Sequence, residues 1–404
     1  MYPTTRPRAA LASVLAVVLS FVLAGQALGF TWGRMSLMTD ADLYPNGWPG
    51  AFAAAGNRLH IVYRLRDADG RMVVYQRSTD GGETWKPAVE LSRASAAQSS
   101  RPTLSVDRSN IDVVWVEGDL QVGPNALWYR RSADAGGTWS APVRLSPLVT
   151  ESVGIPTVTR SGDQVVIAYV ELDTGKLYTR RSSDGGQVWQ SRLGIGTTPI
   201  RPYGEFSWDG VPALDFGTGV LYATWAASGR SVLVRRSLDG GATWGTTMTL
   251  ETSGGESNPR VSAAGSQAMV TFGFADGAGH SYARVRKTTD KGESWSPARK
   301  VSSGTRPATS QDVLRAGGNW RITFMQPYSL GVSLWYRDSP DGVTWSDPTR
   351  FTPHTYAYPH SMGLAYHTYN SRTWVSWLGQ GYSADETATV FVRGSSIGIP
   401  TAAD

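Results

Sequence analysis

Cysteine is absent from the 404-residue sequence, and lysine occurs only five times. The absence of cysteine excludes disulfide bonds, cysteine-ligated zinc and thiol catalysis, so the fold has to be stabilised by its core. With so little lysine, the formal net charge of +5 rests mostly on arginine. The arginines form no dense run, which argues against a nucleic-acid partner, whereas their planar guanidinium groups suit carboxylate ligands.

Long apolar runs are also missing, apart from one at the N-terminus. Arg6 and Arg8 precede an apolar run over 9–24, and small residues at Gly25 and Ala27 follow it. This order predicts a secretory signal peptide over 1–27 and an extracellular location for the mature chain, without stable membrane insertion. The alternative is an uncleaved membrane anchor, because the run is slightly shorter than the roughly 20 residues that span a bilayer.

One short motif recurs six times at intervals of about fifty residues, which is the period of a propeller blade. The six copies are Ser78–Trp85 (STDGGETW), Ser132–Trp139 (SADAGGTW), Ser182–Trp189 (SSDGGQVW), Ser237–Trp244 (SLDGGATW), Thr288–Trp295 (TTDKGESW) and Ser339–Trp345 (SPDGVTW). Such a motif is typical of a hairpin turn, in which the Asp carboxylate accepts backbone N–H bonds two residues on and the glycines tolerate positive φ. Six equivalent aspartates cannot share one site, so we interpret them as structural.

Strand patterns recur around each motif in the order inner, second, third and outer strand. Seven second strands can be counted, one more than the motifs, and the seventh copy (358–396) lacks an outer strand. The segment Thr31–Met38 (TWGRMSLM) matches outer strands such as TWSAPVRL, so we expect the N-terminus to complete the last blade and remove exposed sheet edges. The prediction is a single all-β domain over 28–404, a seven-bladed β-propeller of four-stranded blades, with six blades as the alternative.

The repeated motif resembles the Asp box, or BNR repeat, of the sialidase superfamily, and the resemblance covers nearly the whole mature chain. Well-known members of that superfamily have six blades. The resemblance implies a glycosidase of the exo-α-sialidase type, in which three arginines hold the sugar carboxylate, a glutamate activates a tyrosine nucleophile and an aspartate is the acid/base. Arginine suits such a clamp because bidentate charge-assisted bonds orient a carboxylate.

An X-Pro pair begins each of the seven inner strands. Proline is tolerated there because the innermost strand is a sheet edge, so its missing N–H breaks no ladder bond. The residues before proline vary, and five of them could form a polar and aromatic rim that binds substrate: Trp48, Arg101, Asn258, Arg306 and Tyr358. The alternative is that these side chains only fill the channel.

The longest segment between repeats, 197–210, carries Arg201, Tyr203, Glu205 and Asp209. Long loops on a rigid scaffold often hold functional residues. Tyr328, in a loop between a second and a third strand, should lie on the same face, opposite the Asp boxes.

A catalytic set carried over from the sialidases lacks its first arginine. The sialidase arginine lies two residues before the proline, where this chain has Gly47, Ser100, Gly154, Gly210, Ser257, Thr305 and Ala357. Arg101 and Arg306 lie one residue later and would point to the other side of the strand unless a bulge intervenes. The candidate set is Arg101, Arg201 and Arg306 as the anion clamp, Tyr203 and Glu205 as nucleophile and base, and Asp209 as acid.

Two functions are therefore predicted as alternatives. The first is a secreted sialidase or related glycoside hydrolase that acts on acidic sugars. The second is a non-catalytic propeller that binds a glycan or a protein partner. The sequence contains no cofactor or metal motif, although loop carboxylates could hold a structural calcium ion.

Overall fold

The computed structural model describes residues 30–37, 51–67, 70–92, 99–118, 124–146, 152–198, 211–227, 231–252, 255–276, 278, 280–302, 308–316, 318–328, 331–350, 368–369, 372–379 and 389–397. The predicted signal peptide lies outside these residues. The described part of the chain has no helix long and apolar enough to cross a membrane. All its regular elements are β-strands.

Six four-stranded sheets follow one another along the chain, and in each the strand order is the sequence order. Their strands are β2 (Ala51–Ala55), β3 (Arg58–Asp67), β4 (Gly70–Ser78) and β5 (Val89–Glu90); β6 (Ser99–Asp107), β7 (Asn110–Gly118), β8 (Asn125–Ser132) and β9 (Val143–Arg144); β10 (Thr157–Ser161), β11 (Gln164–Glu171), β12 (Lys176–Ser182) and β13 (Leu193–Thr197); β14 (Ala213–Gly217), β15 (Val220–Ala227), β16 (Ser231–Ser237) and β17 (Met248–Glu251); β18 (Gly255–Ala264), β19 (Gln267–Ala275), β20 (Ser281–Thr288) and β21 (Arg299–Lys300); and β22 (Thr309–Ala316), β23 (Asn319–Tyr328), β24 (Gly331–Ser339) and β25 (Thr349–Arg350).

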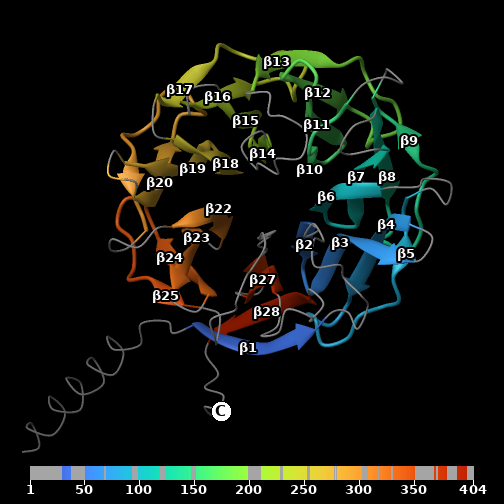
Figure 1. The fold of residues 1–404 in the computed structure, drawn as a ribbon, viewed down its shortest axis with the longest axis horizontal. Helices are drawn as coiled ribbons and strands as arrows, with labels where there is room; N and C mark the ends of the chain where they lie inside the picture. The colour runs from blue at the N-terminus through green and yellow to red at the C-terminus, as the bar shows by residue number, and fades with distance from the viewer. Residues whose placement is uncertain are drawn as a thin grey trace, which may run out of the picture.

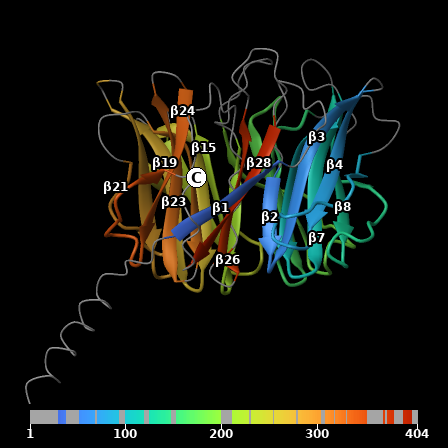
Figure 2. The ribbon, with the colours of Figure 1, turned by 90° about the horizontal axis from the view of Figure 1, so that it is seen from below.

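A further four-stranded sheet combines the two ends of the chain. It has the order β1-β28-β27-β26, with β1 at Phe30–Leu37, β26 at Thr368–Tyr369, β27 at Arg372–Gly379 and β28 at Thr389–Ile397. The prediction that the N-terminal segment completes the last blade is confirmed, because Phe30 pairs with Ile397 and Leu37 with Phe391. The described strands thus form seven sheets arranged as the blades of a β-propeller (Figure 1). The side view shows these sheets standing around the ring axis (Figure 2).

The core lies between adjacent sheets rather than within one sheet. In the second strand β7, Ile111, Val113 and Trp115 pack against residues of the preceding sheet, whereas Val114 and Val116 pack against the following sheet. Successive side chains of a strand point to opposite faces, so a strand between two neighbours is buried on both. This explains why second strands read as continuous apolar runs.

Each Asp box closes a hairpin with its own side chains. In the second box the Ser132 hydroxyl donates to Asp134 Oδ1 (2.7 Å) and accepts from Gly136 N (2.8 Å), while Asp134 Oδ1 accepts from the N–H groups of Gly137 and Thr138 (both 2.9 Å). In this box the backbone donors are three and four residues on, not two as predicted, because the hydroxyl already serves the nearer N–H. These donors, led by Thr138 N, lower the pKa of Asp134.

The six box aspartates share this arrangement, and the structural interpretation of them is confirmed. In the shortened last box the N–H groups of Thr344 and Val343 lower the pKa of Asp341 to about 2. A carboxylate fully engaged in its own turn has little left with which to bind a substrate.

The glycine of the Asp box has to satisfy two requirements, a positive φ in the turn and room for a side chain of the preceding blade. Gly136 has φ +81°, and a Cβ at this position would lie 2.0 Å from Tyr75 Oη of the preceding blade. Gly186 and Tyr129 repeat the contact one blade later, at 1.9 Å. Glycine is needed there both for the turn and for the packing of neighbouring blades.

Basic residues at the ends of the third strands join each blade to the next. In every case the side chain donates to a backbone carbonyl in the Asp box of the following blade. The five bonds are Arg77 to Ala135 (2.7 Å), Arg131 to Gly185 (2.8 Å), Arg181 to Asp239 (3.1 Å), Arg236 to Lys291 (2.9 Å) and Lys287 to Asp341 (2.7 Å). Four of these five residues are arginines, which therefore serve the architecture of the ring.

Candidate functional site

The starts of the inner strands and the ends of the second strands lie on one face of the ring, because the two strands pair antiparallel. Ser99 pairs with Glu117, and Gly255 pairs with Phe274. Arg101, Asn258 and Tyr328 all lie at this end, in β6, β18 and β23. Their backbone positions are described, but their side chains lie outside the described residues.

The other predicted site residues lie outside the described residues altogether. They are Trp48, Arg201, Tyr203, Glu205, Asp209, Arg306 and Tyr358. Their roles therefore stay predictions.

The strand around Arg101 contains a bulge. Between the pairs Ser100–Val116 and Thr103–Val114, β6 has two residues where β7 has one. An extra residue resets the alternation of side chains along the strand. The backbone at Arg101 therefore has the bulge that would let Arg101 take the orientation of the sialidase arginine.

Bulges also occur in the inner strands β18 and β22, before Arg260 and Asp312. Pro102 and Pro259 lie inside β6 and β18 at these irregularities, rather than at the first residue of the strand. Proline is compatible with a bulge because no ladder bond is lost there.

Three acidic side chains on this face have structural partners. Glu117 is 4% exposed and accepts from Trp115 Nε1 (2.9 Å). Glu171 is 8% exposed and forms an ion pair with Arg192 (3.3 Å). Asp276 accepts from His280 N and Tyr282 Oη, both at 2.9 Å, so it too stabilises its own loop.

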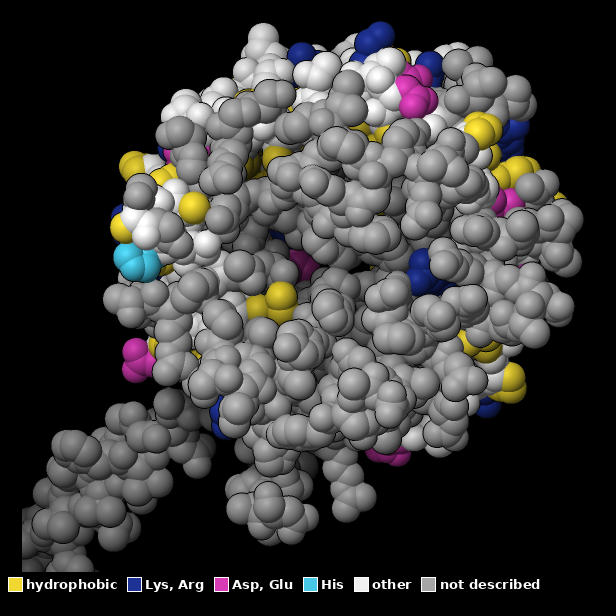
Figure 3. All heavy atoms as spheres, viewed as in Figure 1, with side chains coloured by type: hydrophobic (Ala, Val, Ile, Leu, Met, Phe, Trp, Pro, Cys, Tyr) yellow, Lys and Arg dark blue, Asp and Glu magenta, His cyan; other side chains and the backbone are white. Residues whose placement is uncertain are grey.

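Three charged residues on consecutive inner strands interact electrostatically near the ring axis. Asp215 lies on β14, Arg260 on β18 and Asp312 on β22. Asp215 accepts from Ala263 N of the next blade (2.7 Å) and from Phe216 N (2.9 Å). Figure 3 shows acidic side-chain atoms in the hollow at the centre of the ring. We call Asp215, Arg260 and Asp312 the inner-strand cluster.

Burial shifts the ionisation of this cluster. It raises the pKa of Asp215 to about 7; the two N–H donors oppose the shift and the charge of Asp312 adds to it. Burial also raises the pKa of Asp312 to about 6, and Arg260 opposes that rise. Removal of a carboxylate from water disfavours its charged form, and a nearby like charge has the same effect. Near neutral pH the two acids can therefore hold or release a proton.

Sequence reasoning missed the inner-strand cluster. A signal was available, since Arg260 directly follows the inner-strand proline, where the equivalent residues of other blades are Thr103, Thr157 and Ala213. Variation among the blades at the residue before proline predicted the channel-mouth rim, and the same variation at the residue after proline would have identified Arg260.

The described residues contain no group of three or more His, Asp or Glu side chains that could hold a metal ion.

These features define a class of protein, an all-β propeller whose blades are closed by Asp boxes. A family model described as "BNR repeat-like domain" matches residues 126–366, and one described as "BNR/Asp-box repeat" matches residues 76–87. The first match covers more than half of the chain. The chain belongs to the BNR repeat-like domain family, within the sialidase-like BNR β-propeller superfamily. Among curated protein sequences no match was found.

Solved structures with the same fold include glycoside hydrolases. The GH93 α-L-arabinofuranosidase of Fusarium graminearum, in complex with arabinobiose, shares 13% identity over 89% of this chain and 97% of its own, with a TM-score of 0.54. The Penicillium chrysogenum α-L-arabinanase, also with arabinobiose, shares 14% identity over 90% and 98%, with a TM-score of 0.52. Identity this low establishes similarity of fold alone.

A sialidase is also similar to part of the chain. The Hadza microbial sialidase Hz136 shares 17% identity over 70% of this chain, with a TM-score of 0.49. This chain covers 64% of that sialidase, which is less than two thirds of its length.

Proposed function

We propose that this chain recognises glycans at the mouth of the central channel, on the face opposite the Asp boxes, and hydrolyses an acidic sugar there. The observation that carries the proposal is the bulge at Arg101-Pro102, which removes the geometric objection to an arginine clamp at the start of an inner strand. Arg260 lies three blades further round the ring, at the start of the regular part of β18. A carboxylate-bearing sugar is the ligand that such arginines favour.

The proposed reaction is that of an exo-α-sialidase or a related glycoside hydrolase. Arg101, Arg201 and Arg306 would hold the sugar carboxylate. Tyr203, activated by Glu205, would attack the anomeric carbon, and Asp209 would donate a proton to the leaving oxygen. Trp48, Asn258, Tyr328 and Tyr358 would contact the rest of the glycan.

The test is hydrolysis of a fluorogenic α-sialoside, beside a fluorogenic α-L-arabinofuranoside as an uncharged substrate. We expect turnover of the sialoside and a loss of at least about 100-fold in kcat/KM for the double variant R101A/R306A, because two of three charge-assisted contacts are removed. The matched control is R131A/R181A, which removes two arginines on the Asp-box side. Absence of sialoside turnover by the purified wild-type chain would refute the sialidase form of the proposal.

Binding without hydrolysis is the second candidate, and a specific observation favours it. None of the seven positions two residues before an inner-strand proline is arginine. In that case immobilised sialylated glycans would retain the wild-type chain more strongly than R101A/R306A, with no product formed. If the chain is retained by an immobilised cell-surface protein but by neither saccharide class, the partner is a protein instead of a glycan.

Export of the protein is part of the same proposal. Cleavage after Ala27 would leave a mature chain beginning at Leu28. Intact mass measurement of the protein recovered from culture medium checks this, and recovery of the full-length chain in membranes would instead indicate an anchor.

No cofactor is proposed, so activity should persist in the presence of a metal chelator.

A further inference from the structure

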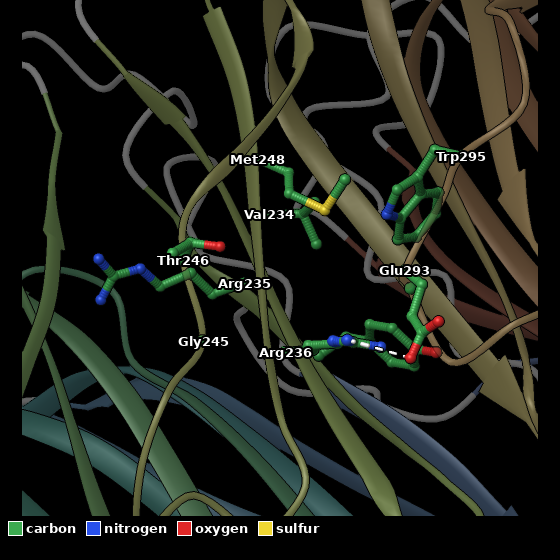
Figure 4. A pocket seen from close by; sticks show the side chains of 10 residues that line it. Val234, Arg235, Arg236, Gly245, Thr246, Met248, Glu293 and Trp295 are labelled. Carbon is green, nitrogen blue, oxygen red and sulfur yellow. Dashed lines mark hydrogen bonds and ion pairs between the residues drawn. The ribbon is translucent and has the colours of Figure 1, made fainter.

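A groove of about 460 Å³ lies on the outer part of the propeller, between the β16–β17 edge of one blade and the Asp box of the next. It is remote from the inner strands, because β16 and β17 are the third and outer strands of their sheet. Its volume is within the range of small-molecule sites. Figure 4 shows the side chains around it.

The walls of the groove are apolar and its floor is polar. Trp295 of the following blade faces Met248 and Val234 across the groove, and Arg236 and Glu293 meet beneath them (Figure 4). Arg236 Nη2 lies 3.4 Å from Glu293 Oε1. An indole wall beside a planar ion pair offers both an apolar surface and directional polar groups.

The floor also holds a buried hydroxyl group. Tyr222 is fully buried, lines the groove, and its hydroxyl has no hydrogen-bond partner among the described residues. Burial raises the pKa of Tyr222 to about 12, so the hydroxyl stays protonated. A buried hydroxyl without a partner costs free energy, and a polar ligand in the groove would provide one.

Gly245 accounts for the opening of this groove. Each box tryptophan is followed by a residue whose N–H donates to the end of the third strand, and Gly245 N donates to Arg236 O at 2.9 Å. In four other blades the side chain of that residue hydrogen-bonds to the end of the third strand. Ser140 Oγ accepts from Arg131 N (3.1 Å), and Gln190 Oε1 accepts from Arg181 Nε (3.0 Å). Gly245 has no side chain to cover Arg236.

We propose that this groove is a second carbohydrate site, distinct from the channel mouth, which binds a single sugar unit of an oligosaccharide. The apolar face of a pyranose or furanose ring would lie against Trp295, because a large rigid aromatic surface buries apolar area at low entropic cost. Its hydroxyl groups would donate to Glu293 and accept from Arg236 and Tyr222. The groove contains both charges, so the proposal does not require an acidic sugar.

Gly245→Gln tests the site with little risk to the fold. A Cβ at Gly245 would meet only Arg236, at 3.4 Å from its carbonyl oxygen, which is an ordinary contact. Gln190 supplies the precedent in the preceding blade. We expect the new amide to cover Arg236 and to lower affinity at least tenfold for arabinobiose and for 3′-sialyllactose, measured by saturation-transfer NMR.

A pair of arginine variants separates binding from stability. Arg236→Ala and Arg181→Ala each remove one bond to the next Asp box, at 2.9 and 3.1 Å, but only Arg236 lines the groove. R236A should lose binding about tenfold, whereas R181A should bind as the wild type does. Failure of both saccharides to bind the wild-type chain, or equal binding by wild type and G245Q, would overturn the proposal.

The two proposals can fail separately. The channel-mouth variant R101A/R306A should keep saccharide binding at the groove even where it abolishes hydrolysis. Loss of binding in G245Q without any sialoside turnover by the wild type would support the groove and refute the hydrolase.

Discussion

Aspartate residues show how far environment decides the behaviour of one side chain. The box aspartates accept several hydrogen bonds at the protein surface, and Thr138 N and the Ser132 hydroxyl lower the pKa of Asp134. Asp215 also accepts two N–H bonds, but burial near the ring axis raises its pKa to about 7. The same residue type therefore stabilises turns in one place and titrates near neutral pH in another.

Asp215→Asn should change how stability depends on pH. The folded pKa of Asp215 is about 7, against an ordinary value of 3.8, so its ionisation is disfavoured in the folded state. Its unfavourable contribution is absent below pH 4, grows between pH 4 and pH 7, and is complete above pH 7. The free energy of unfolding of D215N relative to wild type should therefore rise by on the order of 2 kcal/mol from pH 4 to pH 8, a figure discounted for partial exposure.

Urea denaturation at a series of pH values would measure this change. Asp312 titrates near pH 6 and interacts with Asp215, so D312N provides the companion variant. Parallel stability curves for D215N and wild type would contradict the shifted ionisation.

At the scale of elements, the repeat unit combines a hairpin with a bond to its neighbour. The Asp boxes and the arginines at the third-strand ends could be recognised from sequence because both recur in register. Their partners could not, because a carbonyl in the next blade has no side-chain signature. In the last box-bearing blade the equivalent position is Asp338, which pairs with Arg321 of its own sheet (2.6 Å). Aspartate thus replaces the basic residue in the one blade whose following copy has no Asp box, and so no box carbonyl that could accept from an arginine.

Arg131→Ala should weaken the join between two blades. The variant loses the bond from Arg131 Nη1 to Gly185 O and leaves that carbonyl with one partner fewer. We expect a loss of about 1–2 kcal/mol in the free energy of unfolding, measured by urea denaturation. Arg235→Ala is the control, since Arg235 Nε donates to Thr247 Oγ1 of its own blade (2.7 Å). An equal loss in both variants would show that the bond between blades contributes nothing.

At the scale of the whole molecule, the repeats and the N-terminal strand could be predicted because strand alternation and turn chemistry are local. The sequence could indicate which residues lie at the channel mouth but not the directions of their side chains. A bulge such as that before Thr103 depends on pairing between strands. The inner-strand cluster arises because the ring brings three successive blades together, which no local pattern encodes. The groove at Gly245 likewise depends on two blades, although the missing side chain was visible in the repeat.

Removal of residues 28–37 should destabilise the whole molecule. Without β1 the strand β28 becomes a sheet edge with unpaired N–H and C=O groups, and such edges associate with other chains. We expect a lower melting temperature and oligomers in size-exclusion chromatography. Removal of residues 398–404, which follow β28, is the comparison and should leave the melting temperature and the elution volume unchanged. A stable monomer after loss of β1 would contradict a role for this strand in closure.

The pairing of Phe30 with Ile397 also sets the order of events during biosynthesis. The strand that leaves the ribosome first has to wait for the one that leaves almost last, so the nascent chain cannot complete its final sheet while translation continues. Contacts between residues so distant in sequence form slowly. The ring therefore closes only after synthesis ends, and under the export proposed above the chain would still be open when it meets a translocation pore.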